Sequence, residues 1–170
     1  DIQMKNFSGK EDTAFTVQYD FVMPKRFNLT YIDEAGKKQE PIVIHRSSIG
    51  AIERVMAFLI EHYGGAFPVW LSPVQVKILN ITDRNEKYAQ KIEMELKKSG
   101  LRVELDGNNE TIGKKIRNAE LEKIPYILVV GDKEEKNDSV AVRERGKGDL
   151  GALELEKFIE KIQKEIESKI

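Results

Sequence analysis

The sequence predicts an α/β protein that begins with part of an antiparallel sheet and continues into a domain with a mixed sheet covered by helices. Three observations indicate this fold. Residues 1–44 contain short segments in which polar and apolar residues alternate. Four later segments have apolar residues at helical spacing, and apolar runs bounded by glycine or proline lie between them. Strands that alternate with helices predict a sheet with helices packed on it.

The first part of the chain is expected to contribute strands to a sheet. Pro24 ends the first strand, and residues 34–37 predict a turn after the second. The third is an apolar segment that ends at His45. The three predicted strands are residues 16–22, 29–32 and 42–44. So few strands leave edges unpaired, and we expect them to belong to a larger sheet.

A helix is predicted next, from Ser48 as its N-cap to the stop at Gly64 and Gly65. Its apolar residues recur at helical spacing: Ile49, Ile52, Met56, Leu59, Ile60 and Tyr63. Arg54 lies near the positive end of the helix dipole, where a guanidinium is suited to hold phosphate oxygens. The same spacing also fits a surface arginine that pairs with Glu53 or solvent.

The stiff joint at Pro68, Trp70 and Pro73 predicts a boundary between a domain of residues 1–70 and a domain of residues 71–170. About 100 residues suffice for an independently folded domain.

In the second domain, a helix is expected to begin at a capping box formed by Asp83 and Glu86. Residues 131–138 predict a polar turn, and residues 146–148 predict another, since they lack the pattern of a phosphate-binding loop. Strands are predicted over residues 74–81, 101–105, 126–130 and 140–142, and further helices over residues 112–119 and 155–166. This order predicts a mixed sheet with helices packed on it.

The composition excludes several classes of protein. No apolar run approaches the ~20 residues that span a bilayer, and no signal-peptide pattern is found. The 170 residues include no cysteine, so the sequence has no disulfide and no thiolate metal ligand. With 28 basic and 29 acidic residues the net charge is -1. Any nucleic-acid contact therefore requires a local patch of basic residues.

The second domain contains neither histidine nor cysteine. Acid–base and nucleophilic catalysis are therefore not expected there. Asparagine and arginine can pair with base edges through two hydrogen bonds, and glutamate can accept from amino groups. The candidates for such contacts are Asn109, Arg117, Glu134, Arg143 and Arg145. By themselves these residues also fit a solvated, charged rim.

The most distinctive segment is IHRSSIGAIERVMAFLIEHYGGAFPVWLSPVQV, residues 44–76. It resembles motif 3 of class II aminoacyl-tRNA synthetases, and its flanks resemble the threonyl family, where the catalytic domain runs into the anticodon-binding domain. The TVQYDF segment at residues 16–21 is similar to the T-x-Q-x-D-F strand of that family. The family's W-Q-C ahead of this strand is replaced by Asp-Thr-Ala at residues 12–14.

The resemblance implies roles for four residues of the first domain. Arg54 would be the catalytic arginine that binds ATP, which carries magnesium, and Thr16 and Gln18 would line the adenylate pocket. His45 would be one of three ligands, one cysteine and two histidines, of a zinc ion that recognises threonine. The other zinc ligands and motifs 1 and 2 are expected upstream of this sequence. From the residues alone, Thr16 and Gln18 also fit the polar face of an ordinary strand, and His45 fits a hydrogen-bonded structural histidine.

Residues 107–134 and 140–151 resemble the anticodon-binding domain that the threonyl, prolyl, histidyl and glycyl enzymes share. The resemblance implies a mixed sheet of about five strands with three helices. It places the anticodon-reading residues at Asn109, Arg117, Glu134 and Arg143. Thr111 stands where this family usually has lysine, and Asn108 where it usually has arginine.

The resemblance therefore implies part of a threonine–tRNA ligase, which activates threonine with ATP and transfers it to threonine tRNA. The family is homodimeric, and we expect it to be cytoplasmic. This chain would carry motif 3 and the anticodon-binding domain, and it is expected to be inactive alone. Two alternatives remain open: a stand-alone accessory or interaction protein with an anticodon-binding fold, and a structural α/β module without a role in RNA binding.

Overall fold

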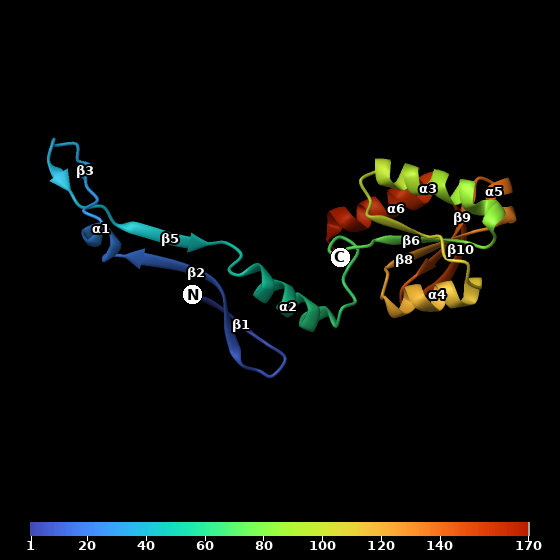
Figure 1. The fold of residues 1–170 in the computed structure, drawn as a ribbon, viewed down its shortest axis with the longest axis horizontal. Coiled ribbons are helices and arrows are strands. Elements are labelled where there is room, and N and C mark those ends of the chain that lie inside the picture. Colours follow the sequence, from blue (N-terminus) through green and yellow to red (C-terminus); the bar gives the residue numbers. More distant parts are fainter. Residues whose placement is uncertain (170) are drawn as a thin grey trace. The chain divides into compact units, whose positions relative to one another are not determined.

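The computed structural model describes residues 1–169, and the chain divides into two compact units. Unit 1 comprises Asp1–Gly64 and unit 2 comprises Gly65–Ile170. Figure 1 shows the elements of both units. The domain boundary expected between residues 70 and 71 stays a prediction. No helix in the described residues has the length and apolar character needed to cross a membrane.

Unit 1 is built on a three-stranded antiparallel sheet in the order β1-β2-β5. Its strands are β1 (Ile2–Lys5), β2 (Glu11–Asp20) and β5 (Val43–Ser47). The predicted strand at residues 16–22 corresponds to β2. β2 begins earlier than predicted because residues 11–15 pair with β1.

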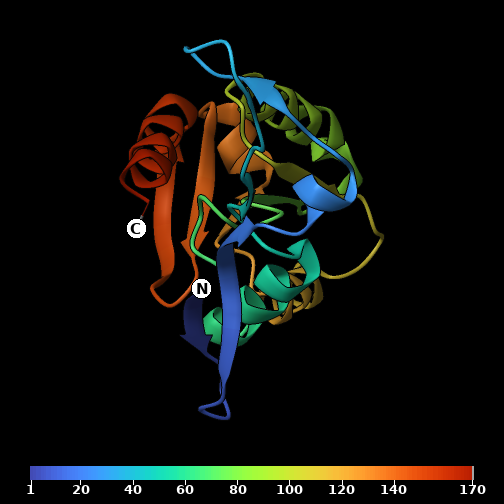
Figure 2. The same cartoon turned by 90° about the vertical axis from the view of Figure 1, so that its left-hand side faces the viewer.

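A second, short hairpin consists of β3 (Tyr31–Ile32) and β4 (Lys38–Gln39), with the expected turn between them. The side chain of Asp33 holds this turn by accepting from the backbone N–H of Ala35 and Lys37. Between β2 and β3 lies the short helix α1 (Met23–Arg26). In Figures 1 and 2 the β1–β2 and β3–β4 turns lie at opposite ends of unit 1.

The predicted helix of unit 1 is α2 (Ile52–Tyr63), which begins after Ala51 and not after Ser48 as predicted. Gly50 explains the late start. Its φ is +71°, and a Cβ at this position would collide with the carbonyl oxygen of Ala14. The chain therefore turns tightly against β2 before the helix begins. The helix ends at Gly64, which has φ 56°, as predicted.

Unit 2 contains a five-stranded mixed sheet in the order β10-β9-β8-β6-β7, which confirms the predicted fold. β6 pairs in parallel with β7 and β8, whereas the β8–β9 and β9–β10 pairs are antiparallel. The strands are β6 (Val76–Asn80), β7 (Val103–Asp106), β8 (Tyr126–Val130), β9 (Ser139–Glu144) and β10 (Gly148–Glu154). The sequence did not predict β10 as a separate strand, since Gly148 and Gly151 interrupt its apolar pattern.

Three long helices cover the two faces of this sheet: α3 (Glu86–Lys98), α4 (Ile112–Leu121) and α6 (Leu155–Ser168). Figure 1 shows α3 and α6 on one face and α4 on the other. The first face has the larger core, where Ile92, Leu96 and Phe158 are fully buried. On the second face, Ala119 of α4 packs with Leu79 and Ile127 of the sheet. The three predicted helices are confirmed.

Two local predictions for unit 2 are wrong. Residues 83–85 form a 3-10 turn (η1, Asp83–Asn85) ahead of α3, so Asp83 does not cap that helix. Residues 131–138 include the short helix α5 (Asp132–Lys136) instead of a simple turn. The carboxylate of Glu134 accepts from the backbone N–H of Gly131 and stabilises the start of α5. The predicted turn near residue 147 does connect β9 to β10.

Candidate functional site

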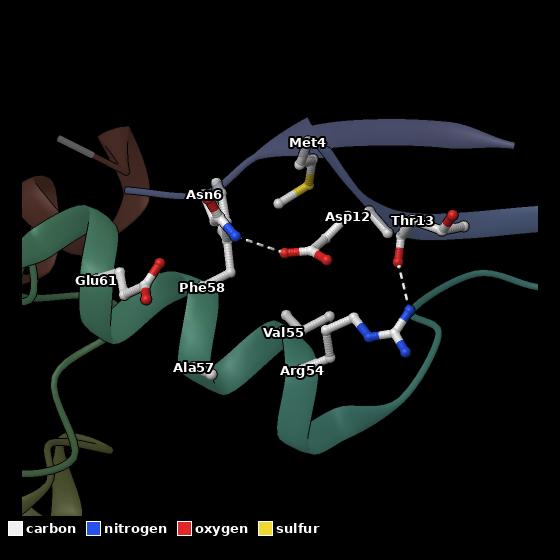
Figure 3. A pocket seen from close by; sticks show the side chains of 10 residues that line it. Met4, Asn6, Asp12, Thr13, Arg54, Val55, Ala57, Phe58 and Glu61 are labelled. Carbon is white, nitrogen blue, oxygen red and sulfur yellow. Dashed lines mark hydrogen bonds between the residues drawn. The ribbon is translucent and has the colours of Figure 1, made fainter. Parts of the chain in front are cut away.

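In unit 1, Arg54 lies in the first turn of α2 and lines a pocket of about 120 Å³ between this helix and the β1–β2 hairpin. Its Nη1 donates to the carbonyl oxygen of Thr13 at 2.9 Å. Asn6 Nδ2 donates to Asp12 Oδ2 at 2.9 Å, and Glu61 lines the same pocket. Figure 3 shows these side chains around the pocket. The pocket thus combines one guanidinium with two carboxylates.

Thr16 and Gln18 lie elsewhere on β2. Thr16 lines a second depression together with Asp1 and Arg46, and its hydroxyl donates to Asp1 Oδ1 at 2.6 Å. Gln18 is exposed and pairs with His45 in the β2–β5 register. In this structure, therefore, Arg54 and Thr16 line different pockets.

His45 on β5 contacts Asp20 on β2, with Nε2 and Oδ2 2.9 Å apart. The backbone N–H of Met23, the His45 ring and the N–H of Val22 hold the pKa of Asp20 below its ordinary value. An ionised carboxylate only accepts hydrogen bonds, so the His45 Nε2 is the donor. In a neutral ring that donates through Nε2, the lone pair is on Nδ1. A ring nitrogen with a free lone pair can bind a metal ion.

A single imidazole does not make a zinc site. Within residues 1–169 no three histidine, cysteine, aspartate or glutamate side chains gather as metal ligands would. The described residues therefore do not fit a zinc ion by themselves, although the carboxylate behind His45 is the usual partner of a metal-binding histidine.

The candidate RNA-binding residues of unit 2 come from four different elements. Asn109 is exposed in the loop between β7 and α4, and Arg117 is exposed on α4. Glu134 lies on α5 and holds the N–H of Gly131, while Arg143 lies on β9. No hydrogen bond or ion pair joins any two of these four side chains in the described part of the chain.

Arg143 belongs to the face of the sheet that α4 covers, because it pairs across the strands with Ile127 of the α4-side core. Its guanidinium lies between two carboxylates: Nη2 is 3.8 Å from Glu120 Oε1, and Nη1 is 3.5 Å from Asp149 Oδ2. Its Nε is buried and has no hydrogen-bond partner. Sequence reasoning missed Glu120 and Asp149, since only the β9–β10 register and the packing of α4 bring them to Arg143.

A pocket of about 280 Å³ lies beside Arg143. Ile124 and Ile127, which are both buried, contribute apolar surface to this pocket. Glu120 and Gly148 also line it. An apolar wall next to donors and acceptors suits a flat, partly polar ligand such as a nucleobase.

Arg145, a candidate for contacts to bases, bonds to the protein backbone instead. Its guanidinium donates to the carbonyl oxygens of Lys123, Ala66 and Phe67, at 2.5, 3.1 and 2.6 Å. These bonds fasten the start of unit 2 to the segment before β8. We therefore leave Arg145 out of the proposed RNA contacts.

Both units match known families. Residues 75–165 match the family described as "Anticodon binding domain". Residues 1–63 match the family described as "tRNA synthetase class II core domain (G, H, P, S and T)".

Similar proteins agree with both matches. The threonine–tRNA ligase of Clostridium botulinum (strain Eklund 17B / Type B) is 53% identical over 99% of this chain, which covers 26% of that protein. The threonine–tRNA ligase of Clostridium tetani (strain Massachusetts / E88) is 49% identical over 100% of the chain, which covers 27% of it. The chain thus spans about a quarter of the length of these curated relatives.

Two solved structures have the same fold. The RNA binding domain of threonyl-tRNA synthetase from Cryptosporidium parvum Iowa II is 34% identical, with a TM-score of 0.78 over 95% of this chain and 41% of that one. Prolyl-tRNA synthetase from Cryptosporidium parvum is 27% identical, with a TM-score of 0.72 over 94% of this chain and 36% of that one. The chain therefore belongs to the anticodon binding domain family, and the residues ahead of that domain match a class II tRNA synthetase core domain.

Proposed function

We propose that this chain is part of an enzyme that activates threonine with ATP and transfers it to threonine tRNA. The observation that carries the proposal is the 53% identity to a threonine–tRNA ligase over 99% of the chain. In the whole enzyme the partners would be threonine, ATP, threonine tRNA and a second copy of the protein, in the cytoplasm. Nothing in the comparisons favours a stand-alone accessory protein or a purely structural module.

In unit 1 we propose that Arg54 binds the phosphates of ATP, with magnesium as the usual counterion of the nucleotide. Its place in the first turn of α2 supports this role, because the helix dipole and the guanidinium both favour negative charge there. Thr16 and Gln18 would line the adenylate pocket. Since Thr16 and Arg54 line different depressions and Gln18 is exposed on β2, a complete ATP site would require further residues of the enzyme.

We propose His45 as one ligand of a zinc ion that recognises threonine. Its hydrogen bond to Asp20 supports the proposal, because it orients the ring and leaves Nδ1 available. The remaining ligands would come from outside the described residues.

In unit 2 we propose that Asn109, Arg117, Glu134 and Arg143 contact the anticodon loop. Single-stranded loops are read by pockets and hydrogen bonds that take up unstacked bases. The pocket beside Arg143 supports such a contact.

The proposal is tested by measuring the affinity of the 170-residue chain for an RNA stem-loop that carries the anticodon of threonine tRNA. A stem-loop with a scrambled loop serves as the reference ligand. Arg143→Ala should reduce the affinity for the threonine stem-loop by roughly 10-fold or more, since one good contact to a base contributes about 1–3 kcal/mol. The loss should be smaller for the scrambled loop.

Lys157→Ala is the matched control, because it also removes one positive charge. Lys157 lies on α6, on the other face of the sheet, and its ammonium pairs with Glu154. The control should bind like the parent chain. Equal affinities of Arg143→Ala and the parent for the threonine stem-loop would contradict the proposed RNA site.

A further inference from the structure

We infer that Glu120 and Asp149 are specificity-determining residues that prevent Arg143 from binding RNA phosphates and reserve it for the edge of a base. The inference rests on the proposed binding of RNA by unit 2. It assigns a role to two carboxylates that are not among the proposed RNA contacts.

The geometry of Arg143 is the first support. Its two terminal nitrogens face one carboxylate each, at 3.8 and 3.5 Å, and its side chain is 29% exposed. Asp149 is itself fixed, because its Oδ1 accepts from the backbone N–H of Gly151 at 2.8 Å across the bulge in β10. Glu120 projects from α4 one helical turn after Arg117. The guanidinium therefore faces carboxylates from two different elements, α4 and β10.

The balance of charge is the second support. One arginine between two carboxylates gives the cluster a formal charge of -1, so it does not attract a phosphodiester as an isolated arginine would. A neutral base carries donors and acceptors side by side on each edge, and it can bond to both kinds of group without displacing either carboxylate. The cluster therefore favours bases over backbone.

The surroundings of the cluster are the third support. The pocket beside Arg143 has the apolar side chains Ile124 and Ile127 in its lining, which suit the face of a base and not a phosphate. Arg145, the next arginine along the chain, is bonded to three carbonyl groups and is not available as a substitute.

The test compares the parent chain with Glu120→Gln, using the threonine anticodon stem-loop and the stem-loop with a scrambled loop. Removing one carboxylate should raise the affinity for the scrambled loop roughly threefold or more, because Arg143 then attracts phosphates. The ratio of the two affinities should fall accordingly. The plot of log affinity against log salt should become steeper by about 0.7, the value for one neutralised phosphate of a single strand.

Three further variants make the result specific. Glu160→Gln removes the same charge from α6 on the other face of the sheet, and it should leave the affinity ratio and the salt dependence as in the parent chain. In an Arg143→Ala background, Glu120→Gln should lose its effect, because the freed charge is then absent. Asp149→Asn should act in the same direction as Glu120→Gln, and circular dichroism should show that every variant keeps the parent fold.

An unchanged affinity ratio in Glu120→Gln would overturn the inference, and so would a gain that persists without Arg143. If the parent prefers the threonine loop but Glu120→Gln has no effect, the inference fails while the proposed function stands. If the parent binds neither stem-loop, both fail.

Discussion

Arg143 and Arg145 are two positions apart, and their guanidinium groups have different partners. Arg143 contacts two carboxylates and lines a pocket, whereas Arg145 bonds to three backbone carbonyl groups. Both arginines were candidates for contacts to bases on the strength of their residue type. The β9–β10 turn begins at residue 145 and directs this side chain to the segment around residue 66 instead.

We predict that Arg145→Ala lowers the free energy of unfolding of unit 2 by about 1–2 kcal/mol, because three carbonyl groups lose a charged donor. Urea titration of the variant and the parent chain, followed by circular dichroism, measures the difference. Lys157→Ala, which removes an exposed charge on α6, should change this free energy by less than about 0.5 kcal/mol. If both variants have the same stability, Arg145 has no structural role.

On α4, one lysine is buried and bonded to the ends of two strands. Lys115 is 3% exposed, and its ammonium donates to Asn80 Oδ1 at 2.9 Å and to the carbonyl oxygen of Asp106 at 3.2 Å. These bonds tie α4 to the ends of β6 and β7, close in sequence to Asn109. The sequence offered no signal for this role, since a lysine in a helix is ordinarily expected to face solvent.

Among the elements, α3 is joined to β9 by one buried hydrogen bond in addition to apolar packing. The hydroxyl of Tyr88 donates to the carbonyl oxygen of Ser139 at 2.8 Å. Burial, together with the carboxylates of Asp138 and Glu135, raises the pKa of Tyr88 to about 12. The folded protein therefore favours the protonated phenol, whose ordinary pKa is 10.0.

This shift predicts a dependence of stability on pH. Since the folded pKa is raised, the contribution of Tyr88 is fully present below pH 10 and is lost as the pH rises toward about 12. Tyr88→Phe should lower the free energy of unfolding by about 1 kcal/mol at pH 7, through the lost hydrogen bond. Between pH 10 and pH 12 the parent should lose stability more steeply than the variant.

Urea titrations of both proteins at intervals of pH measure this difference. Lys77, Lys91 and Lys147 also have raised pKa values, because their ammonium groups donate to carboxylates. They are present in both proteins, so the difference between the two curves isolates the tyrosine. Parallel curves would show that the Tyr88 phenol does not titrate in this window.

For the whole molecule, the main contrast is between the cores of the two units. Both clusters of buried apolar residues in the described chain belong to unit 2. The buried apolar residues of unit 1 are Ala14 and Pro24, and its helix α2 exposes a stripe that consists of Ile52, Met56 and Ile60. Stability depends on buried apolar area, so the two units should differ strongly in stability.

We predict that limited proteolysis of the chain first degrades unit 1 and leaves a resistant fragment that begins near Gly65. Mass spectrometry of the fragments identifies the cleavage sites. A separately produced fragment of residues 65–170 should unfold at the same urea concentration as unit 2 does in the whole chain. Equal resistance of the two units to protease would contradict the prediction.

The exposed apolar surface of unit 1 is consistent with a chain that spans only part of its relatives' length. Residues 1–63 match part of a class II core domain, and the chain spans about a quarter of the relatives' length. The edges of the β1-β2-β5 sheet and the stripe on α2 are surfaces that a larger core would cover. The sequence predicted this incomplete sheet from the small number of its strands.

Sequence periodicity by itself determined the three long helices of unit 2, most of its strands and the class of its sheet. These elements follow local rules, because a helix or strand with one apolar face must bury that face. Its motifs also indicated the family, which the comparisons confirm. Sequence periodicity gave the wrong local structure at three places. A close backbone approach decided the conformation after Ser48, a 3-10 turn decided it at Asp83, and a side-chain cap decided it at residues 131–138.

Only the tertiary structure decided what the candidate site residues contact. No local sequence pattern places Glu120, Arg143 and Asp149 together. Strand pairing and the packing of α4 bring both carboxylates within 4 Å of the Arg143 guanidinium. The contact of His45 with Asp20 likewise requires the β2–β5 register. Side-chain type and spacing predict which chemistry a residue offers, but the charges and donors around it depend on segments distant in sequence, and those surroundings decide what it can bind.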